Sequence, residues 1–585
     1  MLRRLSLFSF ALTLGLLAAC STSPPEPVAL PAAGPERADQ PAAPAPAVTD
    51  ALALAPAAES RLAKARGNLQ GVSGDERKQI VTAAPASLPY PPPFASETRE
   101  TYAPIAANPV QRAAEQPVST FSIDVDTGAY ANVRRFLNEG RLPPRDAVRV
   151  EELINYFDYA YAPPRDRSTP FALHTEIAAT PWNSKTRLLQ VGIQGWQPQH
   201  ADGRGLPASN LVFLVDVSGS MNEPAKLPLV KASLKLLAKQ LRHDDRVSLV
   251  VYAGRTAVVL EPTPGDDVAT ISAALEQLQA GGSTNGAGGI QLAYQMAEKG
   301  YIKGGNNRVM LATDGDFNVG ISDFEQLKNL VEDKRRSGVA LSTLGFGSGN
   351  YNDRLMEQLA DAGNGNYAYI DTLQEAQKVL VAQRAATLAT IAKDVKIQVE
   401  FNPAVVAEYR LIGYENRVLK REDFNNDAVD AGEIGAGHRV TALYEVALVG
   451  EGGEKVDRLR YGNGQLPRAN SDELAFLRVR YKKPQDGEDA KSLLIERPIH
   501  RNEIVAETQT TPAFRLAAAV AAYGQLLRGG TYTGAFGYAE AEQLARGARG
   551  DDAQGYAGEF LQLLRLAGSL ETQQARAGGQ VLGDD

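Results

Sequence analysis

The strongest constraint on the fold is the stretch "LVFLVD" at positions 211–216, an uninterrupted apolar run that ends on Asp216. A strand without polar alternation is typical of a parallel sheet that is covered by helices on both faces. Between about residues 210 and 370, similar runs alternate with amphipathic segments, the first of which carries Val230, Leu234, Leu237 and Leu241 at helical spacing. The alternation predicts an α/β fold: a doubly wound, mostly parallel, Rossmann-like sheet.

Several further segments fit the same sheet. Residues 246–253 and 257–260 form an expected hairpin, and the runs "RVMLATD", "VALSTLGFG" and "NYAYID" form expected strands, with helical patterns between them. In open sheets of this kind, ligands bind beyond the carboxyl ends of the strands. Polar residues at those ends are therefore the candidates for function.

Oxygen-bearing side chains gather at these predicted strand ends. Asp216, Ser218 and Ser220 follow the first strand, Thr284 lies in the glycine-rich loop "GGSTNGAGG", and Asp314 follows a later strand. Two carboxylates and three hydroxyls are hard ligands, which favour Mg²⁺ or Mn²⁺ over zinc or copper. Because only two of the five are charged, the ion would keep positive potential toward solvent. We therefore expect an open position that accepts an acidic side chain from another molecule.

This set of residues resembles the metal-ion-dependent adhesion site (MIDAS) of von Willebrand factor type A (VWA) domains. The resemblance depends on "DVSGS", the threonine of "GGSTNG" and the aspartate of "ATDG", and it covers about residues 210–370. It implies that Asp216, Ser218, Ser220, Thr284 and Asp314 hold the metal. It also implies metal-mediated binding of a partner carboxylate, often with a shift of the last helix, and no catalysis.

The N-terminus is expected to be a targeting segment. Arg3 and Arg4 precede an apolar stretch at 5–17 that is too short to span a bilayer, which predicts a signal peptide over residues 1–19. "LLAAC" resembles the bacterial lipoprotein signal, in which the cysteine, here Cys20, receives the lipid. We expect a protein of the bacterial cell envelope that is anchored in a membrane by this lipid. The same resemblance implies, from Ser21 after the cysteine, the outer membrane, with the chain facing the periplasm or the surface.

The remaining segments divide by composition. Residues 20–118 are rich in Ala and Pro and are expected to form a disordered tether. An N-terminal α+β extension is expected at 119–208, the VWA domain at 209–391, an antiparallel β domain with one solvated face at 392–505, and a helical region at 506–585. This order resembles a group of bacterial lipoproteins in which a VWA domain lies between an N-terminal extension and a C-terminal domain of undefined role.

Three further motifs imitate functional sites. "GFGSGN" at 345–350 has Asn350 where a dinucleotide loop has its third glycine, which argues against a nucleotide. "DTG" at 126–128 imitates an aspartic-protease turn but precedes a predicted helix, so a helix-capping turn is preferred. "DFNNDAVDAGEI" at 423–434 imitates a calcium loop but lacks the turn glycine and the final glutamate.

Three functional hypotheses stay open. The first and preferred hypothesis is a binding protein that holds a partner's acidic residue through Mg²⁺ and is not an enzyme. The second is an envelope scaffold with a structural metal, and the third, less favoured, is an enzyme whose chemistry lies in a flanking domain. The formal net charge of −8 gives no reason to expect nucleic acid as a partner.

Overall fold

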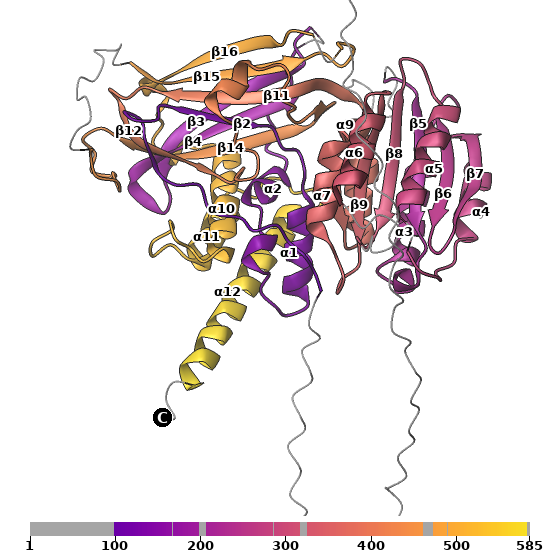
Figure 1. Cartoon of the computed structure of the whole chain (residues 1–585). Coiled ribbons are helices and arrows are strands. Elements are labelled where there is room, and N and C mark those ends of the chain that lie inside the picture. The colour runs from indigo at the N-terminus through magenta and orange to yellow at the C-terminus, as the bar shows by residue number, and fades with distance from the viewer. Residues whose placement is uncertain are drawn as a thin grey trace, which may run out of the picture. The chain divides into compact units, whose positions relative to one another are not determined.

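The computed structural model describes residues 99–165, 168–197, 206–284, 286–315, 324–459, 472–487 and 490–581. These residues form one α/β domain and two antiparallel sheets with a group of helices against them (Figure 1). The signal peptide, Cys20 and most of the expected tether lie outside the described residues. Within the described residues, no helix combines the length and the apolar character needed to cross a bilayer.

The α/β domain contains a six-stranded sheet in the order β10-β9-β8-β5-β6-β7. All neighbours pair in parallel except β7, which is antiparallel to β6, so the expected hairpin is confirmed. The strands are β5 Ser209–Asp216, β6 Arg246–Tyr252, β7 Thr256–Pro264, β8 Asn306–Thr313, β9 Val339–Phe346 and β10 Tyr367–Ile370.

Helices cover both faces of this sheet, and its central strands are therefore buried on both sides. The helices are α3 Leu227–Ala238, α4 Val268–Glu276, α5 Gly286–Lys299, α6 Phe324–Arg335, α7 Asp353–Ala362, α8 Leu373–Gln377 and α9 Arg384–Leu388, with a π-helical turn at Lys378–Ala382. Apolar residues of α3, α4 and α8 share one core with the sheet, and those of α5, α6 and α7 share the other. The doubly wound fold is therefore as predicted.

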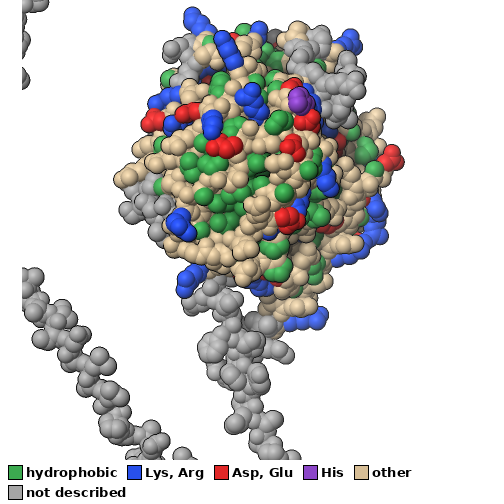
Figure 2. All heavy atoms as spheres, turned by 90° about the vertical axis from the view of Figure 1, so that its right-hand side faces the viewer, with side chains coloured by type: hydrophobic (Ala, Val, Ile, Leu, Met, Phe, Trp, Pro, Cys, Tyr) green, Lys and Arg blue, Asp and Glu red, His purple; other side chains and the backbone are tan. Residues whose placement is uncertain are grey.

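The edge strand β7 leaves part of its apolar surface exposed. Val258, Val259 and Leu260 are half-buried. Figure 2 faces the side of the domain where β7 and α4 lie, and it shows hydrophobic side chains gathered on this face with charged side chains around them. The charged surround is typical of sheet edges that avoid pairing with other chains.

The two antiparallel sheets pack face to face. One has the order β1-β12-β14-β4-β3, and the other has the order β13-β11-β15-β16 with β2 paired to β11. Their inner faces share one apolar core. The strands are β1 Gln111–Arg112, β2 Val118–Ser122, β3 Phe171–Thr180, β4 Asn183–Gly195, β11 Thr390–Phe401, β12 Val406–Ile412, β13 Ile434–Gly435, β14 Arg439–Leu448, β15 Glu473–Lys482 and β16 Leu493–His500.

Helices from both sides of the α/β domain in the sequence form a fourth core against the outer face of the β12-β14-β4 sheet. They are α1 Gly128–Asn138, α2 Val150–Asn155, α10 Pro512–Leu527, α11 Tyr538–Arg546 and α12 Tyr556–Val581. Residues before and after the α/β domain therefore contribute strands to both antiparallel sheets and helices to the core packed against them. The expected division into separate units at 119–208, 392–505 and 506–585 is wrong, because strand pairing joins segments hundreds of residues apart.

The expected tether also extends too far. The N–H of Arg99 donates to the carbonyl of Gly349 at 2.8 Å, and the N–H of Thr101 donates to Tyr351 at 2.9 Å. Glu100 pairs with the buried Arg135 at 2.9 Å. An extended, proline-rich segment cannot build a core of its own, but here its backbone is satisfied by surfaces that other segments supply. Residues 99–118 are therefore part of the folded protein.

The alternating pattern of β11 predicts a solvated outer face, but in the structure this face is covered. Lys396 and Gln398, on the polar face, are each 2% exposed. The ammonium of Lys396 donates to the carbonyls of Asp423 and Asn426, in the loop that imitates a calcium site. That loop therefore covers this face at β11, because the polar residues bond to it. Leu494, Glu496 and Pro498 on the same face of β16 are exposed, so the expected solvated face is confirmed at β16 and wrong at β11.

Three arginines from the flanking regions join them to the α/β domain. Arg149 and Arg417 contact carboxylates of α7, at Asp353, Glu357 and Asp361. Arg134 contacts Asp371 and Glu375, at the start of α8. The three acids of α7 are spaced by four residues and so share one helix face. The contact between the flanking regions and α7 and α8 is therefore charged and largely buried.

Candidate metal-binding site

The strand register brings the two aspartates of the predicted site to one edge of the sheet. β5 ends at Asp216, and Asp314 directly follows β8. The two strands pair in parallel, with Val215 opposite Ala312. Both carboxylates are fully buried, at 0% exposure. Their position beyond adjacent carboxyl ends is where ligands bind in this class of fold.

Asp216 is held by a complete set of local donors. Its Oδ1 accepts from the N–H of Ser218 at 2.8 Å, and its Oδ2 accepts from the hydroxyls of Thr313 at 2.8 Å and Tyr252 at 3.2 Å. Burial raises the pKa of Asp216 to about 6, against the hydrogen bonds from Ser218. The nearby carboxylate of Asp314 contributes to this raised pKa. The side chain is thus fixed in orientation, and a cation would favour its charged form.

The hydroxyls lie in two loops that contact each other. Ser218 and Ser220 have their Oγ atoms 3.1 Å apart. The N–H of Gly219 donates to the carbonyl of Gly282 at 3.0 Å, which holds the loop that carries Thr284 against the loop of the two serines. Gly282 has a φ of +88°, a conformation that glycine adopts without strain. Thr284 is 7% exposed, while Ser220 is only half-buried.

A lysine already contacts one oxygen of the second carboxylate, that of Asp314. The ammonium of Lys226 lies 3.1 Å from Oδ2 of Asp314, and the amide of Asn350 donates to the same oxygen at 3.1 Å. The ammonium also donates to Oδ1 of Asn350 at 3.0 Å. A positive charge is therefore present at this edge of the sheet. Sequence reasoning gave Lys226 no role and used Asn350 only to exclude a nucleotide loop.

The donor set fits a hard divalent cation. Within the described residues, no group of three or more His, Cys, Asp and Glu side chains is arranged to hold a metal. A metal here must therefore use the hydroxyls along with the carboxylates, as Mg²⁺ and Mn²⁺ do. The ammonium beside Asp314 shows that this position accommodates a cation. The residues Asp216, Ser218, Ser220, Thr284 and Asp314 could hold the ion, and that role stays a prediction.

Two supporting residues had only a weak sequence signal. Thr313 directly precedes Asp314, and its hydroxyl both donates to Asp216 and accepts from the N–H of Gly315 at 3.1 Å. Tyr252 ends the neighbouring strand β6. A hydroxyl-bearing residue at the end of an apolar strand next to the site is the pattern that could have identified both.

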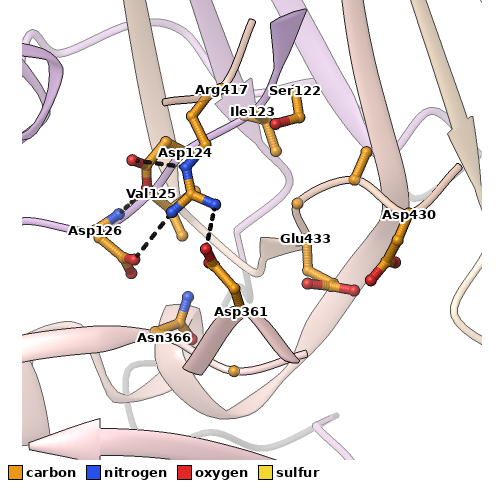
Figure 3. A pocket seen from close by; sticks show the side chains of 13 residues that line it. Ser122, Ile123, Asp124, Val125, Asp126, Asp361, Asn366, Arg417, Asp430 and Glu433 are labelled. Atoms are coloured by element: carbon orange, nitrogen blue, oxygen red, sulfur yellow. Dashed lines mark hydrogen bonds and ion pairs between the residues drawn. The ribbon is translucent and has the colours of Figure 1, made fainter. Parts of the chain in front are cut away.

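A charged cavity, separate from the candidate metal site, lies between the flanking region and the end of α7. It measures about 210 Å³, and Figure 3 shows Arg417 among Asp124, Asp126 and Asp361, with Asp430 and Glu433 on the other side. Arg417 lies 2.7 Å from Asp361 and 3.3 Å from Asp124. Because Arg417 pairs with acids of both the flanking region and α7, this charged cluster holds the flanking region against the α/β domain.

The aspartate of "DTG", Asp126, belongs to this charged cluster. Asp126 accepts from the N–H of Tyr367 at 2.9 Å and lies 3.7 Å from Arg417. The helix that follows begins at Gly128 with Thr127 as its N-cap, but the Thr127 side chain makes no capping hydrogen bond, and the N–H of Ala129 donates instead to the carboxylate of Glu152 at 2.7 Å. The expectation of a capping turn is therefore wrong, because the carboxylate is used to hold the edge strand β10 of the α/β domain.

Glu433 makes the stability of this region depend on pH. Burial, together with the carboxylates of Asp430 and Asp394, raises its pKa to about 8, against Lys393 and Arg335. The folded protein therefore keeps a proton that the unfolded chain loses above its ordinary pKa of 4.5. Between these two values, stability falls as the pH rises.

We expect Glu433→Gln to remove this dependence. The variant should match the wild type at pH 5 and be more stable by about 1–3 kcal/mol at pH 9. Chemical unfolding of both proteins between pH 5 and pH 9 measures the difference. Equal stabilities at pH 9 would show that Glu433 is ionised in the folded protein without cost.

Comparison with known proteins identifies the class. The profile "von Willebrand factor type A domain" matches residues 210–383, and the profile "von Willebrand factor" matches residues 96–190. With the fold and the strand-end residues described above, these matches define the chain as a VWA-domain protein. A third profile, "Uncharacterized protein YfbK, C-terminal", matches residues 386–570.

The relatives narrow the class to one family. The chain is 50% identical to "Uncharacterized protein YfbK" of Escherichia coli (strain K12) over 470 residues, which cover 79% of this chain and 80% of that protein. The chain therefore belongs to the YfbK family of VWA-domain proteins. "Uncharacterized protein sll0103" of Synechocystis sp. is 31% identical over 32% of this chain and 43% of its own length. The solved structure "von Willebrand factor type A from Catenulispora acidiphila" has a TM-score of 0.37 and 14% identity, over 68% of this chain and 91% of that chain.

Proposed function

We propose that this protein binds a partner protein through Mg²⁺ or Mn²⁺ held by Asp216, Ser218, Ser220, Thr284 and Asp314. The observation that carries the proposal is the convergence of two buried carboxylates and two contacting hydroxyl loops at the carboxyl edge of the sheet. When bound, the ion would supply a positive charge and exchangeable water positions. A carboxylate of the partner is the ligand that such a position selects.

The chain's own residues prepare the site for this ligand. Asp216 is oriented by Ser218, Thr313 and Tyr252, so it does not have to reorganise when a cation arrives. The serines and Thr284 are neutral, so they add oxygen ligands without cancelling the charge of the ion. Ser220 is the half-buried member of the set and lies at the solvent side, where a partner can approach.

We place this binding at the bacterial cell envelope. The proposal depends on the signal peptide at 1–19, on Cys20 as the lipid-bearing residue and on the Ala/Pro-rich segment that follows. A lipid at Cys20 would hold the folded region near a membrane, and Ser21 favours the outer membrane. No catalytic step is part of this proposal.

An envelope scaffold with a structural metal is the second candidate. It is favoured by the complete burial of Asp216 and Asp314, both at 0% exposure. In that case the metal would stabilise the loops, and the flanking regions would make the contacts. The two candidates differ in whether partner binding needs the metal.

Cross-linking in intact cells separates them. Wild type and Asp216→Asn are treated with a carboxylate-reactive cross-linker in Mg²⁺ or in chelator, and the products are identified by mass spectrometry. We expect products that involve Asp or Glu of one partner only for the wild type in Mg²⁺. The same products from Asp216→Asn, or in chelator, would support the scaffold instead.

A further inference from the structure

Lys226 is built into the candidate site. The residue is 2% exposed, and its ammonium lies 3.1 Å from Oδ2 of Asp314. Asn350 bridges the pair, because its amide donates to the same Oδ2 at 3.1 Å and its Oδ1 accepts from the ammonium at 3.0 Å. Two donors therefore occupy the one oxygen Oδ2.

The route of the lysine stem is specified by a glycine. A Cβ atom on Gly347 would come within 2.4 Å of both Cγ and Cε of Lys226. Gly347 also has a φ of +75°, which other residues rarely adopt. The segment "GFGSGN", which imitates a nucleotide loop in the sequence, thus provides the space and the bridging amide for Lys226.

We propose that the Lys226 ammonium competes with the divalent metal for Asp314, and that this internal cation keeps the affinity of the site low until a partner carboxylate contributes. The inference depends on the proposed function, because it concerns the same site. In the metal-free protein the ammonium provides a positive charge beside this buried carboxylate. Metal coordination through Oδ2 requires this contact to break, and the remaining charge would still repel the ion.

The displaced ammonium has a second acceptor nearby. Oε1 of Glu223 lies 3.9 Å from the Lys226 ammonium, and the Glu223 side chain is 60% exposed. A small movement toward Glu223 would take the ammonium away from Asp314 and toward solvent. The metal and the Lys226 ammonium would compete for Asp314. Whatever stabilises the metal-bound state therefore weakens the Lys226–Asp314 contact by the same factor.

Metal affinity in Lys226 variants tests the proposal. Mn²⁺ is titrated into wild type, Lys226→Met and Lys226→Gln, and binding is measured by calorimetry and by the electron paramagnetic resonance signal of free Mn²⁺. We expect both variants to bind Mn²⁺ about 5- to 150-fold more tightly than the wild type. We also expect both to unfold at lower temperature without metal and to gain more from metal. Lys226→Gln can still donate to Asp314, so it keeps the test available if Lys226→Met does not fold.

Lys239→Met is the matched control, because Lys239 lies exposed at the other end of α3. It should bind Mn²⁺ with wild-type affinity. Unchanged or weaker binding in both Lys226 variants, with normal binding in the wild type, would overturn the competition and leave the proposed function in place. If Mn²⁺ binds none of the four proteins up to millimolar concentration, the proposed function itself is wrong.

Discussion

Arg149→Met should lower the free energy of unfolding by about 3–5 kcal/mol, because it leaves buried carboxylates without their counter-charge. Arg149 is 1% exposed, and its guanidinium contacts Glu152 and both carboxylate oxygens of Asp353. Glu357 lies 3.7 Å away. Methionine is similar in length and apolar, so the change removes the charge and the hydrogen bonds without creating a large cavity.

The two acids that contact Arg149 directly are fully buried. Asp353 and Glu152 are each 0% exposed, and burial already raises the pKa of Glu152 to about 6. Burial raises the pKa of Glu357 to about 8, even though Arg149 and Arg417 oppose the shift. Without Arg149, Asp353 and Glu152 lose their neighbouring positive charge in a dry environment, which costs free energy at neutral pH.

Urea unfolding of wild type and variant measures the effect. Arg141→Met is the matched control, because Arg141 is 46% exposed and pairs only with Glu139 among the described acids. We expect a change below about 0.5 kcal/mol for this control. A loss below about 1 kcal/mol for Arg149→Met would show that the charged contact between α2 and α7 contributes little to the fold.

Asp216→Asn should abolish the thermal stabilisation by Mg²⁺ that we expect for the wild type, while leaving the fold intact. The amide replaces one acceptor oxygen by a donor, so it removes one of the two negative charges and opposes the hydroxyls of Tyr252 and Thr313. Stabilisation by a ligand grows with its concentration above the dissociation constant, about 2.7 kcal/mol at a hundredfold excess. A loss of affinity of that size would therefore remove the whole effect.

Melting curves in Mg²⁺ and in chelator measure this prediction. The variant should melt at the same temperature in both, whereas the wild type should melt higher in Mg²⁺. The circular dichroism of the variant should match that of the wild type. A variant that keeps the full Mg²⁺ response would mean that the ion binds elsewhere on the chain.

The α/β domain could be predicted from the sequence because its signals are local. The run 211–216 is apolar throughout, and the strand-end residues Asp216 and Asp314 follow from where the apolar runs stop. Parallel pairing of β5 with β8 then places them side by side. Nothing beyond strand assignment and the general rule for such sheets was needed.

The parts that could not be predicted depend on contacts between distant segments. β4 pairs with β14 although about 250 residues separate them, and no short pattern specifies that pairing. Lys226 and Arg149 read as ordinary surface charges in the sequence, yet they are 2% and 1% exposed. Their partners, Asp314 and Asp353, lie far along the chain, so their burial became visible only in the structure.

Calorimetric titration of Mn²⁺ and Mg²⁺ into the purified folded region tests the central claim most directly, since every functional step requires a cation at the strand-end site. The account predicts one ion per chain, bound at or below millimolar concentration, with binding lost in Asp216→Asn. A wild-type protein that takes up neither ion at millimolar concentration would contradict it.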